Sequence, residues 1–107
     1  MINPNEIYQR LCDSGTKWAE LNAQANQLEE MKKVILSRLK SEHARESNAT
    51  AETKALASEE YQTHITGMVE ARRQADIAKV EYESRKAYVD LVRTLESSRR
   101  AEMRLAS

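Results

Sequence analysis

The chain has 107 residues with 17 basic and 17 acidic side chains, so it is at most one ordinary domain with zero net charge. Two glycines and one proline are too few for a turn-rich β-sandwich or barrel. No stretch approaches the roughly 20 apolar residues of a membrane span, and no export signal is visible. The single cysteine, Cys12, has no partner for an internal disulfide, which favours a reducing, cytoplasmic location. Charged residues at 32% and apolar residues at helical spacing predict an all-α protein.

The first 46 residues are predicted to form a short helix and then a long one. Asn3 followed by Pro4 is typical of a helix start, because asparagine caps the first turn and proline fits the first helical position. Ser14-Gly15-Thr16 interrupts the apolar pattern that follows, and we expect a short helix over 1–15 and a long helix over 16–46. The alternative is a glycine tolerated inside one helix at a cost of about 1 kcal/mol. The apolar positions recur three, four and seven residues apart: Ile7, Leu11, Trp18, Leu21, Ala25, Leu28, Ile35 and Leu39.

Residues 47–55 contain mostly small and polar side chains and are predicted to form the connecting turn. A second long helix is expected over 56–105, with Ser58 and Glu60 as an approximate capping signal. One apolar stripe of this helix comprises Ile65, Met68, Val69, Ala75, Ala78, Tyr82, Val89, Val92 and Leu95. A second, neighbouring stripe comprises Ile77, Val80, Ala87, Tyr88 and Leu91.

These segments predict a single helical domain over 1–107, folded as a long antiparallel helical hairpin. A hairpin of two helices buries only one stripe of each helix, and so small a chain gains little stability from that alone. The second stripe therefore needs another molecule, and we expect a homo-oligomeric helical bundle or ring. Its predicted interface residues are Ile77, Val80, Tyr88, Leu91 and Leu95.

Catalytic and metal-binding motifs are not found in the sequence, and we expect a protein that is not an enzyme and has no cofactor. There is no glycine-rich phosphate loop, no His-x-x-x-His and no Cys-x-x-Cys. His43 and His64 flank the predicted turn and would make an incomplete metal site, so they are interpreted as exposed polar residues. Cys12 follows the apolar Leu11 and is expected to be a buried or half-buried structural thiol.

Basic residues gather in two places and are the best candidates for binding a polyanion such as single-stranded DNA. The competing interpretation is a set of ordinary salt bridges along solvated helices. Lys32 also falls at a core position of the heptad pattern, where a lysine stretches toward solvent or fixes the register. Among the aromatic residues, Trp18 and Tyr82 are expected in the core, which leaves Tyr61 and Tyr88 as the more open stacking candidates. The predicted DNA-binding residues are Lys32, Lys33, Arg38, Lys40, Arg72 and Arg73.

The chain resembles the UvsY family of phage recombination mediators over roughly residues 16–105. The first segment that resembles this family is Lys17-Trp18. The next is Glu30-Met31 followed by the basic segment over 32–40. Ala78-Lys79-Val80 with Tyr82, and a helical tail ending near Arg99-Arg100, resemble the second half of that family. The resemblance implies a phage-encoded protein in the host cytoplasm, a ring-like helical oligomer, and single-stranded DNA and a recombinase or single-strand-binding protein as partners. It carries over a DNA-binding role for Lys32, Lys33, Arg38 and Lys40.

The leading hypothesis is thus a non-enzymatic single-stranded DNA-binding recombination mediator. A second hypothesis is a structural or adaptor protein that docks a protein through the exposed stripe of its second helix. A third is a phage inhibitor that mimics DNA with acidic residues near the turn, which the balanced net charge disfavours; these are Glu42, Glu46, Glu52, Glu59 and Glu60.

Overall fold

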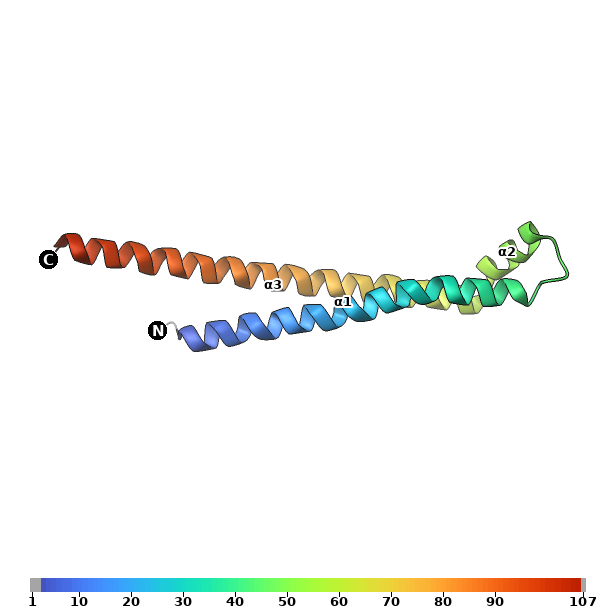
Figure 1. The fold of residues 1–107 in the computed structure, drawn as a ribbon, viewed down its shortest axis with the longest axis horizontal. Coiled ribbons are helices and arrows are strands. Elements are labelled where there is room, and N and C mark those ends of the chain that lie inside the picture. Colours follow the sequence, from blue (N-terminus) through green and yellow to red (C-terminus); the bar gives the residue numbers. More distant parts are fainter. Residues whose placement is uncertain (1–2, 107) are drawn as a thin grey trace.

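The computed structural model describes residues 3–106, which form three α-helices and no β-strand. Helix α1 spans Pro4–Ser41, α2 spans Asn48–Ala57 and α3 spans Glu59–Ala106. The two long helices lie side by side in opposite directions, and the short α2 covers the end where the chain turns (Figure 1). The molecule is a thin rod of 86 × 20 × 15 Å. The expected all-α class and long helical hairpin are therefore confirmed.

The start of α1 follows from the local sequence. The Asn3 side-chain oxygen accepts hydrogen bonds from the backbone N–H groups of Asn5 at 3.0 Å and Glu6 at 3.4 Å. Pro4 occupies the first turn, where no backbone N–H is needed. The predicted cap is confirmed.

Helix α1 continues through Gly15 without a break, so the expected division at residue 15 is wrong. Ser14 is buried, and its hydroxyl donates a hydrogen bond to the carbonyl oxygen of Leu11 at 2.9 Å inside the helix. A Cβ atom added to Gly15 would lie 3.2 Å from Cε2 of Tyr82. The glycine therefore makes room for an aromatic ring of α3, and the gap in the apolar pattern marks this contact.

The turn occupies residues 42–47, earlier than the expected 47–55, and α2 follows it directly. Ser47 caps α2, because its hydroxyl accepts a hydrogen bond from the backbone N–H of Thr50 at 3.2 Å. Ala51 and Ala55, one helical turn apart, are buried. The small residues that suggested a turn instead let a short helix pack closely, since alanine has the highest helix propensity and little bulk.

Helix α3 begins directly after Ser58, as the capping signal indicated. The Ser58 hydroxyl accepts a hydrogen bond from the backbone N–H of Tyr61 at 3.2 Å. The helix starts at Glu59 and extends to Ala106, close to the predicted range of 56–105. With 48 residues against the 38 of α1, its C-terminal end extends beyond the start of α1 (Figure 1).

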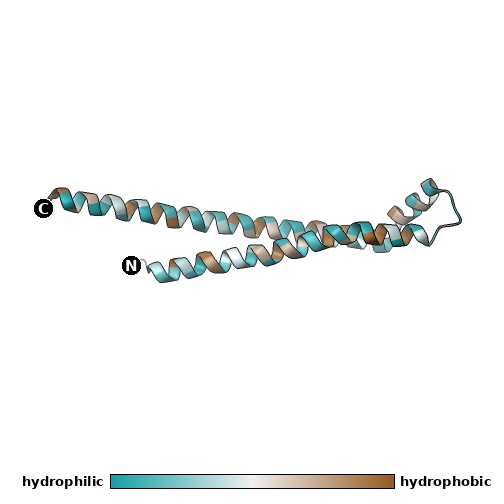
Figure 2. Cartoon of the chain, in the orientation of Figure 1, coloured by the Kyte–Doolittle hydropathy of each residue, from teal (hydrophilic) through white to brown (hydrophobic). Residues whose placement is uncertain are grey.

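The contact between α1 and α3 follows a heptad pattern, with buried or half-buried residues alternately three and four positions apart. We call this set the seam, and Figure 2 shows apolar residues recurring along both long helices. On α1 the seam comprises Ile7, Leu11, Ser14, Trp18, Leu21, Ala25, Leu28, Lys32, Ile35 and Leu39. On α3 it comprises Tyr61, His64, Met68, Ala71, Ala75, Ala78, Tyr82, Arg85, Val89 and Val92.

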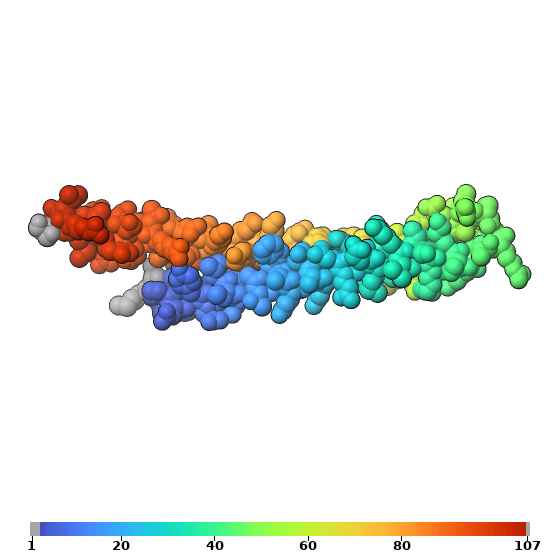
Figure 3. Space-filling view, viewed as in Figure 1, coloured from blue at the N-terminus to red at the C-terminus, as the bar shows by residue number. Residues whose placement is uncertain are grey.

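The middle of the seam is lined by small side chains. Ala25 and Ala75 are completely buried, and Ala78 is 2% exposed. Among the described residues no large side chain is completely buried, because two helices leave the flank of every large residue open. The space-filling view shows the side chains of α1 and α3 meeting along the rod (Figure 3).

None of the described helices is both long and apolar enough to cross a membrane.

We expect substitution by alanine to stabilise the protein to different extents at the two glycines. Gly67 lies on the exposed face of α3, and a Cβ atom there would meet nothing within 4 Å. We expect Gly67→Ala to raise the free energy of unfolding by about 1 kcal/mol, because alanine is the better helix former. Gly15→Ala should gain clearly less, since its Cβ would press on Tyr82. Urea unfolding at one fixed protein concentration measures both, and an equal gain would contradict the packing of Tyr82 against α1.

Candidate interaction surfaces

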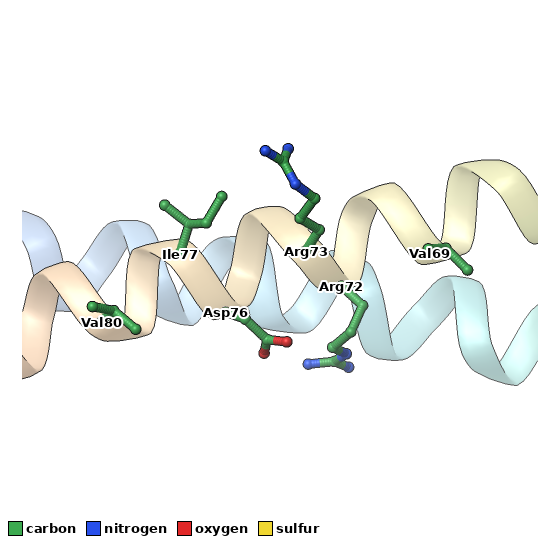
Figure 4. Close-up of a pocket in the computed structure, with 6 residues that line it drawn as sticks. All are labelled: Val69, Arg72, Arg73, Asp76, Ile77 and Val80. Atoms are coloured by element: carbon green, nitrogen blue, oxygen red, sulfur yellow. The ribbon is translucent and has the colours of Figure 1, made fainter.

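Arg72 joins the two long helices and also lines a shallow groove on α3 together with Arg73. Its Nε donates to Glu29 at 2.9 Å, and its two terminal nitrogens donate to Asn22 at 2.8 Å and Asn26 at 2.6 Å. Figure 4 shows Arg72 reaching toward the neighbouring helix while Arg73 extends from the opposite side of α3. Each of the three guanidinium nitrogens therefore donates one hydrogen bond to α1, and a DNA-binding role for Arg72 stays a prediction.

The same contact changes the acidity of both partners. The hydrogen bond from Arg72, helped by the charges of Arg72 and Lys32, holds the pKa of Glu29 below its ordinary value although partial burial opposes this. The hydrogen bond to Glu29 likewise raises the pKa of Arg72. Lys32 is half-buried at the seam, as the heptad pattern indicated, and its charge acts on Glu29. Arg72 thus contributes to the cohesion of the hairpin, whereas Lys32 acts on Glu29 from the same helix.

The remaining predicted DNA-binding residues are spread over two places. Arg38 forms ion pairs with Glu42 at 3.2 Å and with Glu60 on α3. Arg73 pairs with Glu70 at 3.1 Å on the outer side of α3. Lys33 is exposed and Lys40 half-buried, and neither forms an ion pair with another described residue. A shallow groove on α1 is lined by Lys33, Val34, Ser37, Arg38 and Ser41.

The aromatic residues expected in the core do pack there. The rings of Trp18 and Tyr82 stack with centroids 5.6 Å apart, and Lys79 lies over the indole at 5.9 Å. Tyr61 is half-buried in the seam, whereas Tyr88 is 48% exposed. The sequence analysis missed Tyr8, whose ring lies 5.6 Å from the Arg93 guanidinium and whose hydroxyl accepts a hydrogen bond from Arg93. Periodicity gave no signal for this contact, because Tyr8 lies one position after Ile7 and outside the apolar pattern.

The two histidines do not meet. His64 is half-buried, with Nε2 2.7 Å from the carbonyl oxygen of Leu28, so its interpretation as an exposed residue is wrong. His43 lies in the turn, with Nδ1 3.6 Å from Glu46. No group of three histidine, cysteine or acidic side chains within residues 3–106 is arranged to hold a metal ion.

Cys12 is exposed, which contradicts the expectation of a buried or half-buried thiol. It lies one position after Leu11 of the seam, and a step of one residue on an α-helix turns the side chain by about 100° away from that contact.

A row of large apolar side chains remains exposed on α3, and we call it the outer stripe. It consists of Val69, Ile77, Val80, Tyr88, Leu91 and Leu95, which are between 48% and 63% exposed. All five predicted interface residues belong to it. Val69, which the sequence analysis did not place at the interface, also lies on this exposed face.

The outer stripe repeats every eleven residues, unlike the seam. Val69, Val80 and Leu91 are each eleven positions apart, as are Ile77 and Tyr88. Arg73 and Ser84 fill the two remaining positions, and both are exposed. A repeat of eleven corresponds to 3.67 residues per turn, close to the 3.6 of a straight α-helix, whereas the heptad seam winds with the opposite hand. The outer stripe therefore runs nearly straight along α3.

No known protein family, curated protein or solved structure matches this chain. The geometry of these surfaces is therefore the main indication of a function.

The Glu29–Arg72 contact predicts a specific pH dependence. Because the pKa of Glu29 is lowered by folding, its contribution to stability is fully present above the unfolded glutamate pKa of about 4.3. It is lost as the pH falls through the lower pKa of the folded state. We expect wild-type protein to lose more unfolding free energy than Glu29→Gln between about pH 5 and pH 3. Urea unfolding at several pH values tests this, and parallel curves for the two proteins would contradict it.

Proposed function

We propose that this chain is a non-enzymatic structural protein that assembles with further copies of itself through the outer stripe of α3. The observation that carries this proposal is the row of six large apolar side chains along α3 that α1 leaves exposed. Burying a valine, leucine or isoleucine side chain contributes about 1.5–3 kcal/mol, so covering such a row provides a substantial driving force. Every copy carries the same stripe, and a symmetric contact covers two stripes at once.

The limited core of the hairpin supports self-assembly. Its buried residues are mainly alanines, with Leu39 and Val89 as the largest buried side chains. A small domain with so little buried volume gains stability from association. Assembly through α3 would add a second apolar contact to the one that the seam supplies.

A double substitution in the outer stripe tests the proposal. We expect Ile77→Asp/Leu91→Asp to shift the protein from an oligomer to its 12.3 kDa monomer in sedimentation equilibrium, because each copy would bring two charges into the interface. The matched control is Val34→Asp/Leu105→Asp, which changes two exposed apolar residues outside the stripe and should keep the wild-type mass. A monomeric wild-type protein, or a stripe variant with the wild-type mass, would contradict the proposal.

A second candidate function is binding of single-stranded DNA, as expected of a recombination mediator that works with a recombinase or single-strand-binding protein. The observation in its favour is the groove on α1, where Lys33 and Arg38 lie with the hydroxyls of Ser37 and Ser41. Cations and hydroxyl groups are the usual partners of phosphates. An assembly would repeat this groove and multiply weak contacts. A mediator of this kind would be encoded by a phage and act in the cytoplasm of the host.

Charge reversal near the groove tests DNA binding. If the function is correct, wild-type protein binds a labelled single-stranded oligonucleotide in fluorescence anisotropy, with an affinity that falls steeply as salt rises. Lys33→Glu/Lys40→Glu should weaken binding about tenfold or more. The control Lys17→Glu/Lys86→Glu alters net charge equally at exposed residues away from the groove, and it should bind more tightly than the groove variant. Absence of wild-type binding at low salt would exclude this function.

A further inference from the structure

We propose that two copies pack their α3 helices antiparallel along the outer stripes, with the two-fold axis at Ser84. This inference rests on the proposed self-assembly and adds the orientation of the copies, their register and the residues that meet. Three properties of the stripe carry it: its nearly straight path, the symmetry of its spacing, and the position of its charges.

The path of the stripe suits a second helix of the same kind. A partner that wound around α3 in a left-handed coil would follow a heptad pattern, as α1 does. The outer stripe repeats every eleven residues from Val69 to Leu95, so it remains in line only with a partner that is itself nearly straight or carries the same repeat. A second α3 meets this requirement along the whole stripe.

The spacing of the stripe is symmetric about Ser84. Going toward the N-terminus, the stripe positions follow at intervals of four, three, four and four residues. Going toward the C-terminus the intervals are the same when the repeat is continued from Leu95 to the exposed Arg99, which we include in the stripe from here on. An antiparallel pair centred on Ser84 therefore brings every stripe position of one copy opposite a stripe position of the other. Val80 then faces Tyr88 of the second copy, Ile77 faces Leu91, Arg73 faces Leu95, and Val69 faces Arg99.

The side chain at the centre favours close approach. Ser84 is small and exposed, and the residues next to it along the stripe, Val80 and Tyr88, are large and apolar. With the axis at Ser84, two small side chains meet where the helices cross, and each valine packs against a tyrosine ring on either side. Alternating small and large residues is the arrangement that lets two helices interdigitate.

The charges on the stripe favour the antiparallel orientation. In a parallel pair in register, Arg73 would face Arg73 and Arg99 would face Arg99, which places like charges together. In the antiparallel pair, each arginine lies opposite an apolar residue whose side its aliphatic stem can cover. Arg99 forms no ion pair with another described residue, and it reaches the level of Glu70 on the second copy, where Glu70 also pairs with Arg73 of its own chain.

The proposed dimer has a distinct shape. The two α3 helices lie in the middle, the α1 helices lie outside, and the turn ends point in opposite directions. The part of α3 that extends beyond α1 would lie beside the turn half of the second copy. From the rise of 1.5 Å per residue, the dimer would be about 110 Å long, whereas a parallel dimer would keep the 86 Å of one chain.

Single cysteines and a short thiol crosslinker test this arrangement in a Cys12→Ser background, which removes the exposed native thiol. Ser84→Cys should crosslink to a dimer, because this position meets itself across the axis. Leu95→Cys alone should not, but a mixture of Leu95→Cys with Arg73→Cys should form a crosslinked pair. Small-angle scattering of the unmodified protein should give a maximum dimension near 110 Å rather than 86 Å.

A charge swap provides an independent test. We expect Arg99→Glu to raise the dimer dissociation constant about tenfold, because the substitution faces Glu70 twice in each dimer. Combining it with Glu70→Arg should restore part of the affinity, because this second substitution also removes the ion pair of Glu70 with Arg73 in its own chain. Lys86→Glu, at an exposed residue outside the stripe, serves as the comparison for loss of positive charge.

The possible outcomes distinguish failure of the antiparallel arrangement from failure of self-assembly. Crosslinking of Leu95→Cys alone, or no weakening of the dimer by Arg99→Glu, in a protein that does associate through the stripe would overturn the antiparallel arrangement and leave self-assembly standing. A wild-type protein that is monomeric by sedimentation would overturn both. Crosslinking of Ser84→Cys together with the mixed Arg73→Cys and Leu95→Cys pair supports the arrangement.

Discussion

The close contact of α1 and α3 through small side chains at the middle of the hairpin is the constraint on which the rest of the structure depends. Ala25 on α1 and Ala75 and Ala78 on α3 offer no bulk to separate the helices, and all three are buried. Helices in contact at this short range bring polar side chains of one within reach of the other. Arg72 can therefore satisfy its guanidinium on Asn22, Asn26 and Glu29 of α1.

The same constraint explains the arrangement around Gly15. Where the alanines end, the seam receives Trp18 and Tyr82, whose stacked rings need more room than a heptad position usually provides. Gly15 supplies that room by removing a side chain next to the Tyr82 ring. The helix bears the cost of a glycine because aromatic packing across the seam depends on it.

A seam of this kind also determines which surface of the hairpin stays exposed. Each helix turns only one face toward its neighbour, so the opposite face of α3 stays open whatever its composition. The solvent-facing side of a surface helix is typically polar. Here it carries Val80, Leu91 and Leu95 at about 60% exposure, in a repeat that differs from that of the seam. Helix α3 thus carries two apolar repeats. The heptad repeat packs against α1, and the eleven-residue repeat has no neighbour within the described residues.

The helical class, the cap at Asn3, the start of α3 after Ser58 and the uncovered stripe were all determined by local sequence. Each depends on residue type and spacing within a few turns, which is why periodicity and capping rules were sufficient to predict them. The continuity of α1, the helix over 48–57, the exposure of Cys12 and the role of Arg72 were decided only by tertiary structure. Gly15 could be read as a break until Tyr82 was seen beside it, and Arg72 could be read as a free cation until its partners on α1 were known. The continuity of α1 at Gly15 and the contacts of Arg72 depend on residues more than forty positions away, which the hairpin brings together only when α3 folds back along α1.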